Sequence, residues 1–159
     1  MTDSYTIVQT TDAGLFDAFS VRMAAADPWK TLGMDAAACR AGFDGPCKEV
    51  YVARSNGEPA GLAILQVCGS FDGYIQILFV AEAFRDRGLG RRLLAFCEER
   101  IFRHSPNVFI CVSGFNSRAL RMYQAAGYTV VGTLNDFINI GFDELLLRKT
   151  VGPRIGYKQ

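Results

Sequence analysis

Long hydrophobic runs are missing from this sequence, and so is an excess of charge of either sign. Without a stretch of about 18 apolar residues, no transmembrane helix is expected. The 17 basic and 16 acidic residues leave a net charge of +1, which gives no general attraction to nucleic acid or to an anionic membrane. The opening residues Met1–Ser4 lack the basic and apolar segments of a secretory signal. We therefore expect a cytoplasmic protein without a nucleic-acid or membrane partner.

Histidine and closely paired cysteines are scarce as well, which argues against metal and thiol chemistry. His104 is the only histidine, and no second ligand accompanies it at metal spacing, so we expect no metal site. The cysteines are odd in number and widely spaced, and none forms a C-x-x-C motif. Their apolar neighbourhoods indicate small core residues in a reducing cytoplasm. They are Cys39, Cys47, Cys68, Cys97 and Cys111.

No internal repeat, low-complexity tract or flexible linker divides the chain, so we expect a single domain over residues 1–159. Its first half predicts two helices and an antiparallel meander. Apolar residues recur at helical spacing over Ala13–Ala26, Asp35 suits the N-cap of a second helix, and Asn56-Gly57 is a hairpin turn. The strands expected in this half are Tyr5–Gln9, Glu49–Arg54, Ala60–Cys68 and Tyr74–Val80.

In the second half, strands alternate with helices. The helix expected over Gly88–Arg103 carries its apolar residues on one face, as does a helix packed against a sheet, and another helix is expected over Asn116–Ala126. Alternation of this kind implies right-handed crossovers and some parallel pairing. The remaining strands expected are Asn107–Ser113, Tyr128–Thr133 and Phe137–Lys149. The fold class is therefore α/β, a mixed antiparallel/parallel central sheet flanked by helices, with a core over about residues 5–150 and a short C-terminal tail.

The sharpest local feature is a turn, Arg85-Asp86-Arg87-Gly88-Leu89-Gly90, between a predicted strand and a predicted helix. A helix N-terminus exposes unpaired N–H groups, glycines let a phosphate approach the backbone, and arginines add positive charge. The pattern predicts a ligand with a diphosphate group, although taken alone it also fits an ordinary solvated loop. A dinucleotide fingerprint is absent, because Leu93 stands where its third glycine would be, and no G-K-[ST] of a P-loop follows. A nucleotide-dependent oxidoreductase is therefore disfavoured.

Two segments together carry a family resemblance. The turn, R-x-x-G-x-G after a strand, resembles the acyl-CoA pyrophosphate motif, Q/R-x-x-G-x-G/A, of the GNAT acetyltransferase superfamily. Downstream, the segment from Val112 to Tyr128 resembles that family's V-x-x-x-N-x-x-A-x-x-x-Y-x-x-x-G-[FY] pattern, and Glu144–Lys149 resembles its last strand. The likeness covers about residues 5–150, with both motifs in the expected order. It implies a GNAT-like acyl-CoA-binding fold, with acetyl-CoA as the acyl donor and no metal.

The resemblance also implies roles for individual residues. Asn116 would hydrogen-bond the CoA group, and Tyr123, two helical turns away on the same face, would protonate the departing thiolate. Without the family pattern, Tyr123 would be interpreted as a core aromatic residue. The main-chain groups of Phe79 and Val80 would pair with the pantetheine arm where two parallel strands splay apart. The pyrophosphate would be held by the backbone of Arg85, Asp86, Arg87, Gly88, Leu89, Gly90 and Arg91.

An ammonium must lose a proton before its nitrogen can attack, and a carboxylate is the usual acceptor of that proton. Glu82, Asp136 and Glu144 are candidates, although each also fits a solvated surface carboxylate. Gln76, two positions before Leu78 and therefore expected on the same side of the strand, is a fourth candidate that would order a water molecule.

The acceptor pocket is predicted less directly than the donor site. Trp29, the only tryptophan, lies in a loop-like stretch between the first two helices, where the family builds its substrate wall. It would line the acceptor site together with Tyr74. The alternative is a packing anchor that attaches the loop to the core.

The function expected is an acetyl-CoA-dependent N-acetyltransferase that moves an acetyl group to a primary amine of a small molecule or peptide. Transfer would be direct, in a ternary complex, because Cys97 and Cys111 are expected on core faces rather than in a site. The alternative is a non-catalytic acyl-CoA-binding regulatory module, which the retained Asn116 and Tyr123 disfavour. The last strand, expected to be exposed, and the tail Gly152–Tyr157 are candidates for a homodimer contact.

Overall fold

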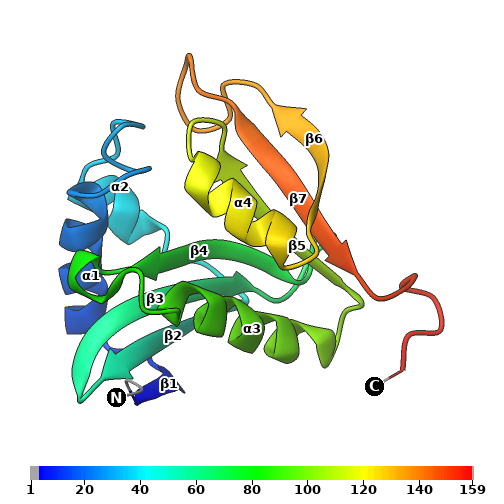
Figure 1. Cartoon of the computed structure of the whole chain (residues 1–159), viewed down its shortest axis with the longest axis horizontal. Coiled ribbons are helices and arrows are strands. Elements are labelled where there is room, and N and C mark those ends of the chain that lie inside the picture. Colours follow the sequence, from blue (N-terminus) through cyan, green and yellow to red (C-terminus); the bar gives the residue numbers. More distant parts are fainter. Residues whose placement is uncertain (1–3, 159) are drawn as a thin grey trace.

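The computed structural model describes residues 4–158, so Met1–Asp3, on which the expectation about a secretory signal partly rests, lie outside the described residues. The described chain folds around a seven-stranded sheet of order β1-β2-β3-β4-β5-β7-β6 (Figure 1). Neighbouring strands run antiparallel except β4 and β5, which are parallel. This confirms the mixed sheet flanked by helices. The elements are β1 (Tyr5–Gln9), α1 (Ala13–Ala24), α2 (Ala36–Ala41), β2 (Lys48–Ser55), β3 (Glu58–Gln66), β4 (Tyr74–Val80), the short 3₁₀ helix η1 (Glu82–Phe84), α3 (Leu89–Phe102), β5 (Asn107–Ser113), α4 (Ser117–Ala125), β6 (Thr129–Leu134) and β7 (Glu144–Thr150).

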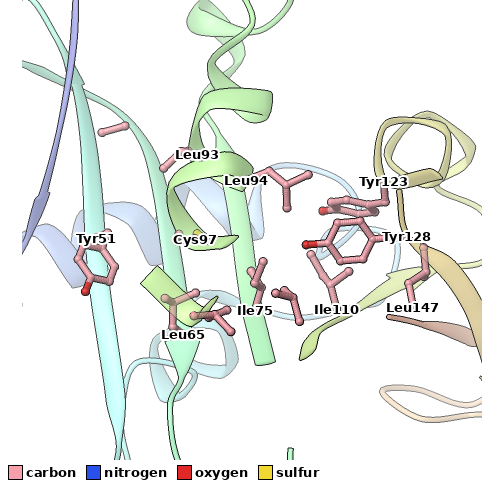
Figure 2. Packing of buried hydrophobic residues seen from close by; sticks show 14 of the residues in the cluster. Tyr51, Leu65, Ile75, Leu93, Leu94, Cys97, Ile110, Tyr123, Tyr128 and Leu147 are labelled. Atoms are coloured by element: carbon pink, nitrogen blue, oxygen red, sulfur yellow. The ribbon is translucent and has the colours of Figure 1, made fainter. Parts of the chain in front are cut away.

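Helices cover both faces of the sheet, and each face has its own hydrophobic core. On one face, Phe19 and Met23 of α1 are buried together with sheet residues such as Leu62. The other core joins α3 and α4 to the sheet, and Figure 2 shows Tyr123 and Tyr128 packed beside Ile110 in it. α3 buries the stripe that helical spacing predicts, Leu89, Leu93, Leu94, Cys97 and Ile101. Within the described residues, no helix combines the length and apolar composition needed to cross a bilayer.

Short polar residues set the boundaries of several elements. The Asp12 carboxylate accepts two N–H groups from the first turn of α1, and the Asp35 carboxylate accepts one in α2. The β2–β3 hairpin turns at Asn56 and Gly57, whose φ angles are 49° and 86°. This is the two-residue turn that Asn-Gly predicts, so the local chemistry alone determines this hairpin.

The segment before β7 departs from expectation. The sequence predicts a strand from Phe137 onward, but β7 begins only at Glu144. Asp136 and Gly141 have φ angles of 50° and 84°, and Asp136 Oδ1 accepts the Gly141 N–H at 2.6 Å, so the apolar residues between them form a loop. β7 itself lies between β5 and β6. The expectation of an exposed last strand is therefore wrong, and a homodimer stays a prediction.

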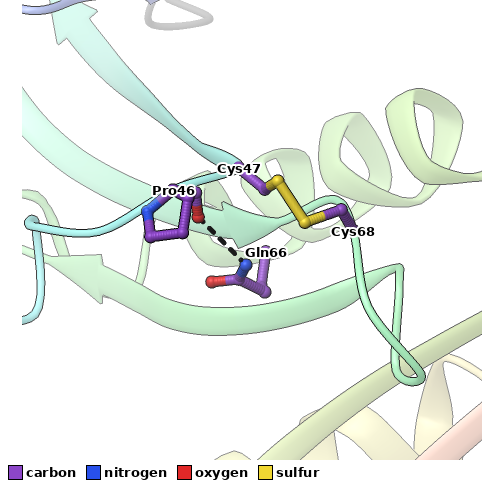
Figure 3. Close-up of a disulfide and its surroundings, with 4 residues drawn as sticks. All are labelled: Pro46, Cys47, Gln66 and Cys68. Atoms are coloured by element: carbon purple, nitrogen blue, oxygen red, sulfur yellow. Dashed lines mark hydrogen bonds between the residues drawn. A yellow bond between two sulfur atoms is a disulfide. The ribbon is translucent and has the colours of Figure 1, made fainter.

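Two of the cysteines form a disulfide, so the expectation that all five are core thiols is wrong for this pair (Figure 3). Cys47 and Cys68 have Cα atoms 5.7 Å apart and join the ends of the β2–β3 hairpin. The hairpin register brings the residues before β2 and after β3 together, which the neighbourhood of each cysteine alone does not reveal. Cys39 and Cys97 are buried thiols, as predicted.

Candidate active site

A gap opens between the two parallel strands of the sheet. In the described chain, β4 and β5 pair only at Tyr74 with Phe109 and at Ile75 with Ile110, and beyond these pairs the strands diverge (Figure 1). A cavity of about 830 Å³ lies along the gap, lined by residues of α3 and α4 and by the segment that follows α1. The cavity therefore reaches both faces of the sheet. A splay between two parallel strands at this position is what the family resemblance implies.

The pairing of β4 with β3 determines which main-chain groups face the gap. Ala81 donates its N–H to the Ala60 carbonyl at 2.9 Å, and bonded pairs in an antiparallel ladder recur at every second residue. Phe79 therefore directs its main-chain groups toward β3, whereas Leu78 and Val80 direct theirs toward the gap. Of the two residues expected to pair with a pantetheine arm, only Val80 directs its main-chain N–H and C=O into the gap, because those of Phe79 are directed toward β3.

A bulge in β4 changes the face on which its side chains lie. The pairing with β3 passes from Ile75 to Ile77, so Gln76 is an extra residue. Ile75 and Leu78 pack in the core beside α3, whereas Ile77 packs in the core beside α1 and α2. The Gln76 side chain lies on the same face as that of Ile77, because its Nε2 donates to the Gly42 carbonyl at 3.0 Å on the α2 side. The expectation that Gln76 and Leu78 share a side is therefore wrong, although Gln76 does line the cavity.

The turn before α3 presents backbone N–H groups to the cavity. Gly88 is the N-cap of α3, and no side chain among residues 4–158 caps this end of the helix. The Arg92 N–H donates to the Gly88 carbonyl at 3.1 Å, so the N–H groups of Leu89, Gly90 and Arg91 precede the helical hydrogen-bond ladder. All three residues line the cavity. An uncapped helix N-terminus of this kind is an anion-binding arrangement.

The two glycines of the turn differ in what they require. Gly88 has a φ of 80°, which L side chains rarely adopt, and a Cβ there would find nothing within 4 Å. A Cβ on Gly90 would make an ordinary contact, 3.5 Å from Met122 Sδ. Backbone conformation therefore demands glycine at position 88, and the open space beside it leaves room for a ligand to approach.

Cationic side chains surround this end of the cavity. The arginines that line it are Arg85, Arg91, Arg118 and Arg121. Arg85 Nε donates to the Val80 carbonyl at 3.1 Å, and Arg118 forms an ion pair with Asp86. Arg87 is not among the described lining residues. The sequence motifs did not single out the two arginines of α4, although their helix begins directly after the motif residue Asn116. Uncapped N–H groups and guanidinium groups together fit a diphosphate.

The α4 residues of the second motif also reach the cavity. Asn116 is the N-cap of α4, where its Oδ1 accepts the Ala119 N–H at 3.2 Å, and it lines the cavity. Tyr123 lines the cavity while only 6% exposed, and its ring packs edge-on to Tyr128 with centroids 5.9 Å apart. Burial, and then the nearby Cys97, raise the pKa of the Tyr123 phenol above its usual value of 10. Its hydroxyl therefore stays protonated at neutral pH and has a proton to donate.

Aromatic side chains line the cavity on the face of the sheet opposite α3 and α4. Trp29 lines the cavity and also packs edge-on against Phe79 with centroids 5.7 Å apart, so it does anchor the loop, and its place in an acceptor wall stays a prediction. Tyr74 lines it too, and burial raises the pKa of its phenol. Asn139, in the loop before β7, donates its Nδ2 to the Leu32 carbonyl at 2.9 Å. This hydrogen bond connects two loops that both line the cavity, one through Trp29 and Leu32 and the other through Phe137 and Ile138.

The three candidate carboxylates occupy different environments. Glu144 is 3% exposed and lines the cavity, and its Oε1 accepts the Ser113 hydroxyl at 2.5 Å. Burial raises the pKa of the Glu144 carboxyl, and the Ser113 hydrogen bond partly opposes that shift. Asp136 and Glu82 are exposed and are not among the described lining residues. The interpretation as a solvated surface carboxylate is therefore wrong for Glu144, while Asp136 is a turn residue.

Besides the two arginines of α4, sequence reasoning missed two cavity residues on β5. Ser113 is buried beside Glu144, and Cys111 is half-buried and lines the cavity rather than the core. Their alternation along the strand was a signal, because residues two apart share a face. Burial raises the pKa of the Cys111 thiol, so it stays neutral. In the part of the chain that the structure describes, no group of three or more His, Cys, Asp or Glu side chains is arranged to hold a metal.

Comparisons with known proteins agree with this geometry. The sequence model of the acetyltransferase (GNAT) family matches residues 15–128. Acetyltransferase Atu2258 of Agrobacterium fabrum is 39% identical over 61 residues, which span 38% of this chain and 44% of that protein, less than half its length. The ribosomal-protein-alanine N-acetyltransferase of Escherichia coli superposes with a TM-score of 0.73 at 19% identity, covering 98% of this chain and 99% of that chain. An aminoglycoside 6'-N-acetyltransferase complexed with coenzyme A gives 0.70 at 16% identity, covering 94% and 98%.

Proposed function

Since this chain belongs to the acetyltransferase (GNAT) family, we propose that it is an acetyl-CoA-dependent N-acetyltransferase whose acceptor is a primary amine of a small molecule or peptide. The observation that carries the proposal is the gap between β4 and β5, because it joins two differently equipped halves of one cavity. The donor half holds the N-terminus of α3 with Arg85, Arg91, Arg118 and Arg121. The acceptor half holds the aromatic Trp29 and Tyr74 and the buried carboxylate of Glu144. Acyl donor and acceptor would therefore meet within the sheet.

The exposed N–H groups and the positive charge of the donor half support binding of the CoA diphosphate there. The N–H groups of Leu89, Gly90 and Arg91 would donate to phosphate oxygens, with the lining arginines balancing the negative charge. The main-chain groups of Val80 and Leu78 would pair with the extended arm along the gap. When bound, acetyl-CoA supplies a thioester whose acyl carbon is open to attack by an amine.

Tyr123 would donate a proton to the leaving sulfur. Its burial and raised pKa keep the phenol in the protonated form that an acid catalyst needs. Asn116 and Tyr123 line the same cavity from one helix, which supports a role for the tyrosine along the path of a ligand anchored at the turn. Transfer would be direct, without an acyl-enzyme.

The test combines binding and turnover in the wild type and two tyrosine variants. Calorimetry measures acetyl-CoA affinity, and a thiol-release assay with a panel of primary amines measures transfer. In the Tyr123→Phe variant, kcat is expected to fall about 100-fold, in the range of general acid catalysis, with the acetyl-CoA affinity unchanged. Tyr128→Phe is the matched control, because Tyr128 is buried in the same core but is not among the cavity-lining residues.

Two results would contradict the proposal, in different ways. Acetyl-CoA binding without turnover on any amine would favour a regulatory acyl-CoA-binding module. A folded protein without affinity for acetyl-CoA would remove the donor site altogether. The two structural neighbours act, by their names, on aminoglycosides and on a ribosomal-protein alanine. At 16% and 19% identity they share the fold only, so the acceptor has to be inferred from this chain's own cavity.

A further inference from the structure

Glu144 lies on the face of the sheet away from α3 and α4. Its neighbour Leu145 and the buried Leu147 pack in the core beside α3, and alternate residues of a strand point to opposite faces. Ser113, the partner of Glu144 in the β5–β7 register, shares this face. Tyr123 approaches the gap from α4, on the opposite face. The carboxylate and the phenol therefore line one cavity from the two sides of the sheet.

The Glu144 carboxylate is held rigidly. Its backbone is paired with Ser113 of β5 on one side and with Leu134 of β6 on the other. The Ser113 hydroxyl, itself buried, donates to Oε1 at 2.5 Å. A side chain fixed by two neighbouring strands and a buried hydrogen bond holds one position, as a group that takes a proton from a bound ligand must.

Glu144 is a buried carboxylate without a cation. It is 3% exposed, and no arginine or lysine among residues 4–158 forms an ion pair with it. A buried charge normally has a partner of opposite charge, because desolvation without one is costly. The side of Glu144 that faces the cavity is where such a partner can enter. A ligand with an ammonium group would complete this site.

The surroundings of Glu144 offer little to a second positive charge. Of the other two cavity carboxylates, Asp86 pairs with Arg118, and Asp27 accepts two hydrogen bonds from Thr31 and already has Lys30 and Arg85 as cationic neighbours. Most side chains that line the cavity on this face are apolar or aromatic, and the polar ones beside Glu144 and Asp27 are the uncharged Gln76, Cys111 and Ser113. The apolar and aromatic ones are Pro28, Trp29, Leu32, Tyr74, Phe137 and Ile138. Such a lining favours a hydrocarbon skeleton over a polar or polycationic one.

We propose that Glu144 binds the ammonium group of the acceptor and takes its proton, and that the acceptor carries this single charge on an apolar skeleton. The inference rests on the proposed acetyl transfer and specifies its acceptor. The ammonium nitrogen passes one proton to the Glu144 carboxylate, and the lone pair so freed attacks the acyl carbon. A C–N bond forms and the C–S bond breaks. The sulfur takes a proton from the Tyr123 hydroxyl, the new amide nitrogen returns its second proton to Tyr123, and Glu144 releases one proton to solvent.

Phenethylamine is the acceptor probe for the Glu144→Gln variant, which keeps an oxygen for the Ser113 hydroxyl. At pH 7, kcat/KM for phenethylamine is expected to fall about 100-fold, because the ammonium then has no base to receive its proton. The difference in kcat/KM between the wild type and Glu144→Gln should shrink about tenfold for each unit by which the pH is raised, because the amine then loses its proton in solution before it binds. The titratable groups facing Glu144 are the Tyr74 phenol and the Cys111 thiol, both kept neutral in this range by their raised pKa values. A deficit of constant size across pH would overturn the assignment.

Two further measurements separate this site from the donor site. Phenethylamine should bind the CoA-loaded wild type at least tenfold more tightly than the CoA-loaded Glu144→Gln variant by calorimetry, with CoA affinity itself unchanged. Glu82→Gln, a change at an exposed glutamate that is not among the lining residues, should match the wild type in every assay. Equal phenethylamine affinity in both CoA-loaded proteins would overturn the ammonium site while leaving the acetyltransferase proposal intact.

The acceptor class is tested by comparing amines of one and several charges. Phenethylamine and hexylamine should exceed putrescine, spermidine and kanamycin in kcat/KM by at least tenfold. A preference for the polycations would overturn the apolar, monocationic assignment, again with acetyl transfer intact. No CoA binding and no transfer to any amine would overturn this inference together with the proposed function.

Discussion

The donor half and the acceptor half of the cavity are built differently. The anion-binding part of the donor half is one turn between Arg85 and Arg91, whose backbone N–H groups begin α3 and to which α4 adds Arg118 and Arg121. The acceptor half is assembled from side chains that come from four separate stretches of the chain, with Trp29 after α1, Tyr74 on β4, Ser113 on β5 and Glu144 on β7. One half therefore depends on backbone conformation, and the other depends on which side chains a sheet register brings together.

This difference predicts how each half responds to change. A backbone site tolerates most side-chain replacements but fails when its φ and ψ angles are disturbed. A side-chain site keeps its backbone while losing one contact at a time. Substitutions in the donor half should therefore weaken acetyl-CoA binding, and substitutions in the acceptor half should weaken amine binding. A substitution in one half that weakens the binding of both substrates equally would contradict this separation.

The largest effect in this comparison is expected at Gly88. Gly88→Val places a β-branched side chain at a φ of 80° and in the path of the ligand. Backbone strain at position 88, or a displacement of the turn, that costs about 3 kcal/mol of binding free energy corresponds to about 100-fold weaker acetyl-CoA binding. Gly57→Val is the matched control, since Gly57 has a φ of 86°, also with nothing within 4 Å of a Cβ, in a hairpin turn that is not among the lining residues. Calorimetry should show wild-type affinity in the control, and equal losses in both variants would attribute the effect to stability alone.

The same division explains what the sequence could predict. The Asn56-Gly57 hairpin, the apolar stripe of α3 and the anion-binding turn at Gly88 all follow from residues close together in the chain, and all are present. The burial of Glu144 depends on pairing with β5 and β6, which join segments far apart in sequence. The position of Gln76 depends on a bulge that shifts the register of β4 against β3. Local pattern carries no information about either contact.

A smaller effect is expected in the acceptor half, at Trp29. Trp29→Ala removes one aromatic wall of the cavity, which should raise the acceptor KM about tenfold, a loss near 1.4 kcal/mol, and leave the acetyl-CoA KM unchanged. Trp29→Phe retains a ring that packs on Phe79, so it distinguishes a role in lining the cavity from a role in attaching the loop to the core. Steady-state kinetics with phenethylamine and acetyl-CoA measures both constants. An unchanged acceptor KM, or an equal rise in both constants, would remove Trp29 from the acceptor site.

The smallest effect is expected at Cys111, the only thiol among the described residues that line the cavity and therefore a candidate covalent carrier between the two halves. Its thiol is neutral, because burial raises its pKa, and a thiol attacks a thioester only as the thiolate. Direct transfer therefore predicts that Cys111→Ala retains kcat within about threefold, the change expected from a lost packing contact or hydrogen bond. Double-reciprocal plots should intersect, and intact mass after incubation with acetyl-CoA should show no acetylated protein. A loss of activity of about 100-fold or more, with parallel plots, would mean that the acyl group passes through the protein, and the two halves would then work in sequence rather than together.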